Sequence, residues 1–328
     1  MRLGLRSFVS RQLTTALGEL LPAQKLLVYR DNLDFFRRFH TLVVSEKTSL
    51  LLKTRYGLDG LRIVHTRHGA GDRAIGFGKE SALFDLVLVA GPKIARRLAE
   101  EAEVPPERIR TVGYSKFDLY AANRIADPFP APSKPIVLYT PHPSPRLSSW
   151  YRMGAALMDA FAASDRYNLI FAPHVMMFAR PWTVTISPPA IRRMRKPDAR
   201  WRDAPNLLVD LGSTASTDMS YTNLADVYIG DVSSQVYEFL YRARPCLHLN
   251  AHAVSWQGDP DYAHWQAGPV VGPGADIVAA VDRAIETHAD FEPTQRKLLE
   301  DTFSITEKPA SARAAEAIAQ FVARGRQA

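Results

Sequence analysis

The sequence of 328 residues is nearly free of cysteine, since Cys246 stands alone. One cysteine excludes an internal disulfide and a zinc site built on thiolates, and it favours a reducing compartment. No run reaches the roughly 18 apolar residues that a membrane-spanning helix needs. P-loop, Gly-x-Ser-x-Gly and Gly-x-Gly-x-x-Gly motifs are absent too, so P-loop phosphoryl transfer, α/β-hydrolase chemistry and dinucleotide oxidation lack support.

The overall composition indicates a folded protein that attracts anions. Hydrophobic residues make up 46% of the chain and charged residues 23%, which excludes wholesale disorder. The net charge of +7 favours phosphorylated small molecules, lipid headgroups or nucleic acid as partners. The densest basic cluster carries no nucleic-acid motif, so we expect no nucleic-acid partner, and the cluster is either a solvated face or an anion-binding loop. Its members are Arg192, Arg193, Arg195, Lys196, Arg200 and Arg202.

The N-terminal segment 1–21 has the pattern of an amphipathic helix. Arg2, Arg6 and Arg11 alternate with apolar residues, and Arg11 with Gln12 interrupts the apolar stretch that a signal peptide would need. The helix either docks on its own domain or contacts a membrane surface. We therefore expect a cytoplasmic protein, with peripheral attachment to the inner face of the cell membrane as the second interpretation.

Short apolar runs alternate with amphipathic stretches, which is the pattern of parallel strands joined by helices. We expect strands in the first half at 26–29, 42–45, 62–65, 85–90 and 109–113, and in the second half at 136–140, 168–172, 207–210, 227–230, 246–249 and 270–271. Helices are expected over 92–103, 151–163, 234–242, 275–286 and 311–324.

A proline-rich stretch separates the two halves. Four prolines within 128–135 cannot continue a helix or a central strand. We therefore expect an N-terminal domain over 1–126, a connection over 127–135 and a C-terminal domain over 136–328. Two consecutive doubly wound parallel sheets predict a binding crevice at the carboxyl ends of their strands.

Unusual residues follow three of the expected strands at that edge. The stretch 65–71 holds His65, His68 and two glycines, and a histidine there can take a proton from a hydroxyl or bind phosphate. Pro173 fixes the backbone before His174. Asp231, Ser233 and Ser234 open a helix whose free N–H groups form an anion site. Each motif also has a plain structural reading, as a turn or a cap. The His-x-x-His spacing lacks a third ligand, so we expect no metal.

Taken in order, these motifs resemble the CDP-glycerol glycerophosphotransferase family, the teichoic-acid-type polymerases and their relatives. The first resemblance is 65–70, His-Thr-Arg-His-Gly-Ala, followed by Ile75 and Gly76. The turn 112–118 and the strand end 139–142, Tyr-Thr-Pro-His, are similar as well. The most specific part is 225–239, in which Asp231, Ser233 and Ser234 match the family's Asp-Tyr-Ser-Ser block and Glu238 matches its acidic position.

The resemblance implies a GT-B fold, with two Rossmann-like domains facing across a cleft, and no metal or cofactor. The implied reaction is attack of an acceptor hydroxyl, which can be lipid-linked, on the β-phosphorus of CDP-glycerol, with release of CMP. By the same pattern His68 would be the general base, and His174 would contact the donor phosphates. The substrate pocket would be completed by Arg67, Gly69, Thr140, His142, Asp231, Ser233, Ser234 and Glu238.

Three other functions stay open on the sequence. A GT-B glycosyltransferase would use a nucleotide sugar as donor. A nucleotide-sugar 2-epimerase would need carboxylates for proton abstraction, for which Asp72, Asp118 and Glu238 are the candidates. A non-catalytic nucleotide- or lipid-binding scaffold would keep the fold and lack turnover. Binding and CMP-release measurements separate these cases.

Overall fold

The computed structural model describes residues 23–67, 69–120, 122–130, 134–179, 181–186 and 189–325. By the contacts among its residues the chain divides into two compact units. The first holds the described residues up to Ala70, Ala74–Ser115 and the segment from Asp301 onward. The second holds Gly71–Arg73 and Lys116–Glu300. The expected helix over 1–21 lies outside the described residues.

The first unit contains a four-stranded parallel sheet in the order β1-β2-β3-β4. The central strand β3 is buried along its whole length, as expected for a parallel strand covered on both faces. The sequence predicted all four strands to within about two residues. Their bounds are β1 (Thr41–Val44), β2 (Arg62–His65), β3 (Leu86–Val89) and β4 (Ile109–Thr111).

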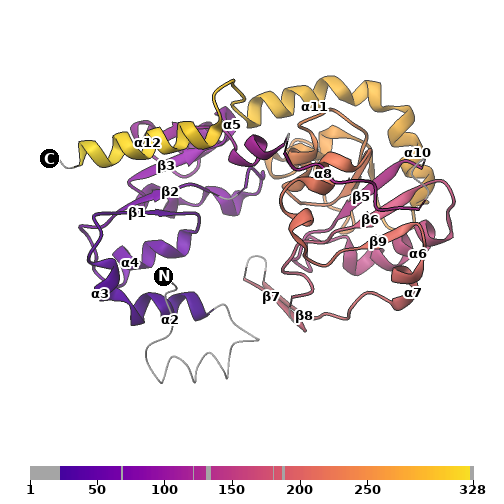
Figure 1. Cartoon of the computed structure of the whole chain (residues 1–328), viewed down its shortest axis with the longest axis horizontal. Helices are drawn as coiled ribbons and strands as arrows, with labels where there is room; N and C mark the ends of the chain where they lie inside the picture. Colours follow the sequence, from indigo (N-terminus) through magenta and orange to yellow (C-terminus); the bar gives the residue numbers. More distant parts are fainter. Residues whose placement is uncertain are drawn as a thin grey trace. The chain divides into compact units, whose positions relative to one another are not determined.

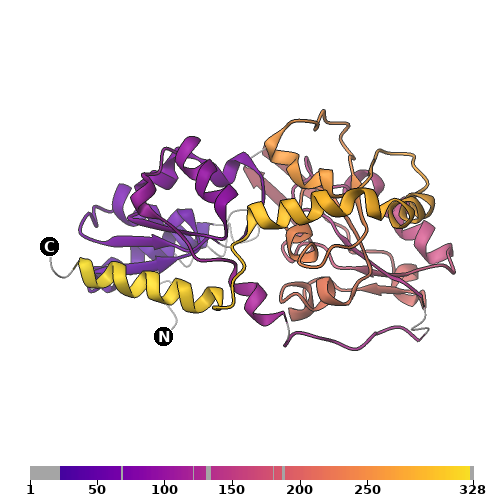
Figure 2. The ribbon, with the colours of Figure 1, turned by 90° about the horizontal axis from the view of Figure 1, so that it is seen from above.

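Helices cover both faces of this sheet. On one face Ile94 and Leu98 of α5 (Pro92–Glu100) pack into the main core of the unit. On the other face α12 (Ala310–Arg324) lies along the strands and packs Ile318 and Phe321 against them (Figures 1 and 2). This packing explains why the C-terminal segment belongs to the first unit, whereas the sequence predicted it in the second. The short helices here are α2 (Ala23–Asp31), α3 (Leu33–Phe36) and α4 (Leu51–Thr54).

The strand predicted at 26–29 is wrong, because these residues lie inside helix α2. A short apolar run cannot be assigned to strand or helix by periodicity alone. Here Ala23, Gln24 and Lys25 precede the run, and all three have high helix propensity.

The second unit contains a six-stranded parallel sheet in the order β12-β11-β10-β5-β6-β9. Chain order reverses between the neighbours β5 and β10, which pair in parallel from Val137↔Val227 to Thr140↔Gly230. This is the strand order of a doubly wound Rossmann-like sheet. The strands are β5 (Ile136–Thr140), β6 (Asn168–Phe171), β9 (Leu207–Val209), β10 (Val227–Gly230), β11 (Cys246–Leu249) and β12 (Val270–Val271), close to the predicted ranges.

The core of the second unit lies between this sheet and its helices. Leu157 and Phe161 of α6 (Ala155–Ala163) and Val281 of α10 (Ile277–Glu286) pack on the buried strand residues. A π-helical turn (Trp150–Gly154) leads into α6. The remaining helices are α7 (Ala199–Asp203), α8 (Ser220–Leu224), α9 (Gln235–Phe239) and α11 (His288–Thr302). Among the residues described, no helix is long and apolar enough to cross a membrane.

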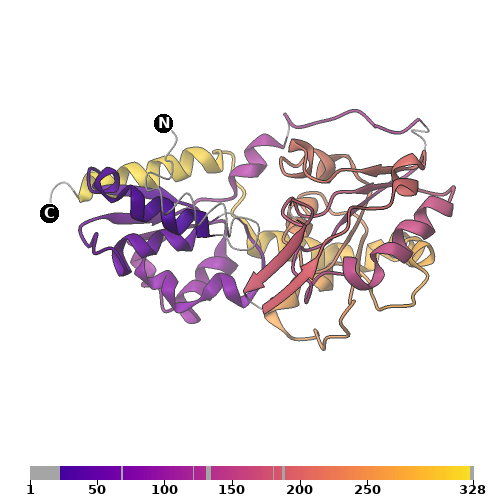
Figure 3. The same ribbon diagram turned by 90° about the horizontal axis from the view of Figure 1, so that it is seen from below.

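One element of the second unit was not expected from the sequence. Strands β7 (Trp182–Ile186) and β8 (Pro189–Arg193) form a separate antiparallel pair, seen side by side in Figure 3. Its prolines suggested a loop, but proline is tolerated at the start of a two-stranded ribbon, where one backbone edge is free.

Candidate functional site

The carboxyl ends of β5, β6 and β10 collect the second unit's candidate residues. Thr140 ends β5 and is followed by Pro141 and His142, while Ala172, Pro173 and His174 follow β6, and Asp231 follows β10. Because β5 and β10 are the strands at which chain order reverses, their loops diverge and leave the usual position for a ligand in an open α/β sheet. The structure thus brings four of the predicted residues to one sheet edge.

Asp231 fixes the two loops that flank this edge. Its buried carboxylate accepts hydrogen bonds from the backbone N–H groups of His142 (2.9 Å), Ser149 (2.6 Å) and Val232 (2.7 Å). The Ser149 hydroxyl donates to it as well, at 2.9 Å. Burial raises the pKa of this carboxyl, while the hydrogen bonds favour its ionised form. At 1% exposure Asp231 positions the backbone of both loops, and its predicted contact with substrate stays a prediction.

A buried histidine reaches the same turn from the other side. His264 places Nε2 3.0 Å from the carbonyl oxygen of Asp231 and Nδ1 2.9 Å from Oδ2 of Asp72. Both ring nitrogens therefore lie within hydrogen-bond distance of an oxygen atom that accepts hydrogen bonds. Trp265 adds a bond from Nε1 to the same carbonyl, at 2.7 Å. His264 and Asp72 therefore form a buried hydrogen-bonded pair beneath the turn after β10.

The loop that contains Asp72 belongs to the second unit, although it follows strand β2 in the chain. The Tyr237 hydroxyl of α9 lies 2.8 and 2.7 Å from the two carboxylate oxygens of Asp72. Gly71 lies so close to Ser234 that a Cβ on Gly71 would come within 3.1 Å of the Ser234 Cβ. The segment Gly71–Arg73 is thus attached to α9 and to the turn that begins it.

Positive charge and imidazoles gather beside this turn. Burial lowers the pKa of His142 to about 3, and the charge of Arg73 and the ring of His174 act in the same direction. His142 Nδ1 accepts from the N–H of Ser144 at 3.0 Å, so the neutral ring carries its proton on Nε2. His174 is exposed, and its Nδ1 accepts from the N–H of Met176 at 3.3 Å. Arg73 and His174 are near enough to His142 to lower its pKa, and the carboxylate of Asp261 acts on Arg73. Arg73, His142 and His174 all carry N–H groups that can donate to an anion.

The two predicted serines remain accessible. Ser234 is exposed and Ser233 is half-buried, and the Ser233 hydroxyl accepts from the N–H of Gln235 at 3.3 Å. Ser234 stands at the N-cap of α9, yet its side chain makes no capping hydrogen bond. Because the hydroxyl of Ser234 is not used to cap the helix, it can hydrogen-bond to a ligand.

Two other predicted residues are engaged within the protein. Glu238 is buried, and its Oε1 accepts from Lys116 Nζ at 2.8 Å. Thr140 is buried too, and its Oγ1 donates to the Tyr228 hydroxyl at 2.7 Å. Both residues support the sheet edge rather than offer a polar group to solvent.

The predicted residues of the first unit follow strand β2. Arg67 donates from Nη1 to the Gly76 carbonyl at 2.8 Å, and its guanidinium lies 5.0 Å from the centre of the Phe77 ring. Burial, with a smaller effect of Arg97, lowers the pKa of Arg67 to about 10. Gly69 continues this loop. His68 lies outside the described residues, so its role stays a prediction.

Sequence reasoning missed the Asp72–His264 pair as part of the site. The two residues are 192 positions apart, so no local sequence pattern connects them. The local sequence offers one signal. Gly69 and Gly71 come just before Asp72, and glycine is common where a backbone passes close to another element.

No family model matches the sequence, and no curated protein matches it. Solved structures do share the fold. A variant of the wall teichoic acid polymerase TagF soaked with CDPG superposes with a TM-score of 0.61 at 14% identity, covering 88% of this chain and 74% of that one. The S. aureus MnaA–UDP co-structure gives 0.55 at 13% identity, covering 96% and 81%.

The UDP-GlcNAc 2-epimerase from Neisseria meningitidis bound to UDP-GlcNAc is similar as well. Its TM-score is 0.56 at 11% identity, with 93% of this chain and 84% of that chain covered. Together with the two parallel sheets, these similarities confirm the predicted fold class, a GT-B-type protein with two Rossmann-like domains.

Proposed function

We propose that this protein is a transferase that moves glycerol phosphate, or a related phosphate-linked group, from a CDP-activated donor to a hydroxyl acceptor. The observation that carries the proposal is a group of hydrogen-bond donors near the point where strand order reverses. These donors are Arg73, His142 and His174, with the hydroxyls of Ser233 and Ser234. A diphosphate presents several anionic oxygens, which such a set of preorganised donors stabilises.

The chemistry assigned to the site is a single displacement at phosphorus. The acceptor oxygen bonds to the β-phosphorus, the bond from that phosphorus to the bridging oxygen breaks, and CMP leaves with the bridging oxygen. The acceptor proton passes to His68, the general base that the family resemblance implies. His174 contacts the donor phosphates and stabilises the charge that develops on the departing CMP.

The neighbouring residues have positioning roles in this proposal. Asp231 holds the loops of His142 and Ser149, and His264 ties the turn after β10 to Asp72. Rigid support of this kind keeps the hydrogen-bond donors oriented toward the phosphates, so that the loops need not rearrange during the reaction. Ser233 and Ser234 then bind the diphosphate through their hydroxyls. Arg67 and Gly69 contribute to the acceptor side.

The solved structures with a similar fold support a nucleotide-linked donor. One is a polymerase soaked with CDPG, and two others contain UDP or UDP-GlcNAc. A nucleotide-sugar glycosyltransferase is therefore the second candidate, because it would use the same phosphate-binding groups with a different base and sugar.

A 2-epimerase fits less well, although solved epimerases share the fold. Epimerisation needs carboxylates that can exchange a proton with the sugar. Of the three candidates, Asp72 is buried against Tyr237 and His264, and Glu238 is buried against Lys116. These contacts leave two of the candidate carboxylates engaged within the protein.

A calorimetric titration combined with a CMP-release assay tests the proposal. The titration compares CDP-glycerol with UDP-GlcNAc and a GDP-sugar, and the assay measures CMP release in the presence of hydroxyl acceptors. The proposal expects tight binding of CDP-glycerol and acceptor-dependent release of CMP. Binding without release on any acceptor would favour a scaffold, and preference for a nucleotide sugar would assign the protein to the second candidate.

A further inference from the structure

The antiparallel pair β7–β8 has two faces of opposite character. Residues directly opposite each other in an antiparallel pair place their side chains on the same face, and residues alternate along each strand. Trp182 pairs with Arg193, and Thr183 pairs with Arg192. Trp182, Arg193 and Ile191 therefore share one face, while Thr183 and Arg192 share the other.

The face with Thr183 and Arg192 is turned toward the body of the second unit. Thr183 is 8% exposed. The guanidinium of Arg192 lies 5.6 Å from the centre of the Tyr151 ring, and the Tyr151 hydroxyl contacts Met194 Sδ at 3.2 Å. Thr183 is thus covered by the second unit, whereas Arg192 stays exposed with its guanidinium beside the Tyr151 ring.

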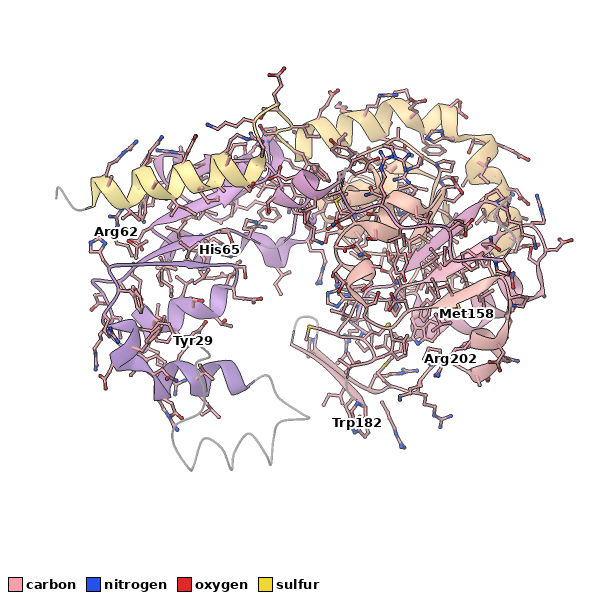
Figure 4. All side chains as sticks on the ribbon, in the orientation of Figure 1. Tyr29, Arg62, His65, Met158, Trp182 and Arg202 are labelled. Carbon is pink, nitrogen blue, oxygen red and sulfur yellow. The ribbon has the colours of Figure 1, made fainter. Side chains whose placement is uncertain are left out.

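The opposite face exposes apolar side chains. Trp182 is 41% exposed and Ile191 is 69% exposed, both among the larger exposed apolar residues of the described chain. Figure 4 shows the labelled Trp182 at the outer rim of the second unit. Trp182 and Ile191 therefore form a small exposed apolar surface on one face of the pair.

Positive charge flanks this apolar face. Arg193 lies on it, and Arg195 and Lys196 follow directly; all three are exposed. Nearby Arg200 already pairs with Asp159 and Asp198. The first acidic residue after β8 is Asp198, so the stretch next to Ile191 carries unbalanced positive charge. Apolar side chains bordered by exposed cations complement a membrane surface, in which acyl chains lie beneath anionic headgroups.

We propose that β7–β8 and the following residues 193–196 form a docking surface for an anionic lipid bilayer. Trp182 and Ile191 enter the boundary between headgroups and acyl chains, where tryptophan is favoured. Arg193, Arg195 and Lys196 attract the lipid phosphates. This docking does not depend on the proposed transfer reaction, because it requires neither donor nor acceptor.

A fluorescent probe at position 191 tests the contact directly. The single native cysteine, Cys246, is 1% exposed, so Ile191→Cys in the full chain can be labelled selectively with an environment-sensitive dye. Vesicles of phosphatidylcholine with phosphatidylglycerol should shift its emission to the blue and increase its intensity, and pure phosphatidylcholine vesicles should not. An unchanged spectrum with the anionic vesicles would overturn the proposal.

Vesicle co-sedimentation of full-length variants supplies the second measurement. Trp182→Ala with Ile191→Ser, and separately Arg193→Glu with Lys196→Glu, should lower the partition coefficient on anionic vesicles at least about tenfold. The matched controls are Ile305→Ser and Lys297→Glu, which change an exposed apolar residue and an exposed lysine elsewhere and should leave binding unchanged. Circular dichroism checks that each variant is folded.

Two outcomes would contradict the lipid assignment. Hairpin variants that bind vesicles as well as the parent protein would place any membrane contact elsewhere in the chain. Hairpin variants that no longer bind soluble polyphosphate but still bind vesicles would show that the surface binds an anionic polymer and not a bilayer.

Discussion

The imidazole of His264 forms a buried hydrogen-bonded pair with Asp72, with 2.9 Å between Nδ1 and Oδ2, while its Nε2 lies 3.0 Å from the carbonyl oxygen of Asp231. This pair connects the segment Gly71–Arg73 to the turn that begins α9.

Replacing one member of the His264–Asp72 pair should lower the free energy of unfolding. Asp72→Asn removes a carboxylate oxygen from the buried hydrogen bonds with His264 and Tyr237, so we expect a loss of about 1–3 kcal/mol in the free energy of unfolding. Urea denaturation measures it, and Asp59→Asn, at an exposed aspartate, is the control. A loss below about 1 kcal/mol for Asp72→Asn would show that the pair does not stabilise the loop.

The buried neutral ring of His142 predicts a pH-dependent stability. Its pKa is about 3 in the folded state and about 6.5 when unfolded, so only the unfolded state binds a proton between these values. Stability should therefore fall as pH decreases through this window. Between pH 7 and 5 the parent protein should lose about 2 kcal/mol more than His142→Asn. His40→Asn, at an exposed histidine, is the control and should behave like the parent.

The serine hydroxyls should contribute to donor affinity. Ser233→Ala with Ser234→Ala removes two hydrogen bonds to charged oxygens, each worth about 1.5–3 kcal/mol. We expect the Kd for CDP-glycerol to rise at least about tenfold in calorimetry, whereas Ser255→Ala, at an exposed serine of another loop, should not change it. Equal affinity in the double variant would remove the serines from the phosphate site.

The buried contact between Glu238 and Lys116 should stabilise the second unit. Glu238→Gln leaves Lys116 Nζ without its charged partner at 2.8 Å, and we expect a loss of about 1–3 kcal/mol in urea denaturation. The exposed pair Lys308–Glu316 provides the control, because Glu316→Gln should cost less than about 1 kcal/mol. A smaller loss of stability in Glu238→Gln than in Glu316→Gln would show that the contact between Glu238 and Lys116 does not stabilise the second unit.

Much of the fold could be predicted because parallel strands appear in a sequence as short apolar runs. The strands Arg62–His65, Ile136–Thr140 and Val227–Gly230 were predicted to the residue. The same rule failed at 26–29, where an apolar run belongs to helix α2. Helix α11 was missed because Pro293 lies inside it, and β7–β8 was missed because prolines flank its turn.

The positions of the candidate residues were easier to predict than their contacts. Thr140, His174 and Asp231 do lie at or just after the carboxyl ends of parallel strands, as expected, and their part in a site stays a prediction. Whether such a residue faces solvent depends on partners distant in sequence, such as Ser149 for Asp231 and Lys116 for Glu238. Local sequence patterns carry no information on those pairings.

The rate of CMP release from CDP-glycerol, measured at saturating donor with a hydroxyl acceptor, tests the central claim most directly. The protein should release CMP only with acceptor, and His68→Ala should be at least about a hundredfold slower with unchanged donor affinity. Release by His68→Ala at the parent rate, or no release by the parent protein, would contradict the assignment.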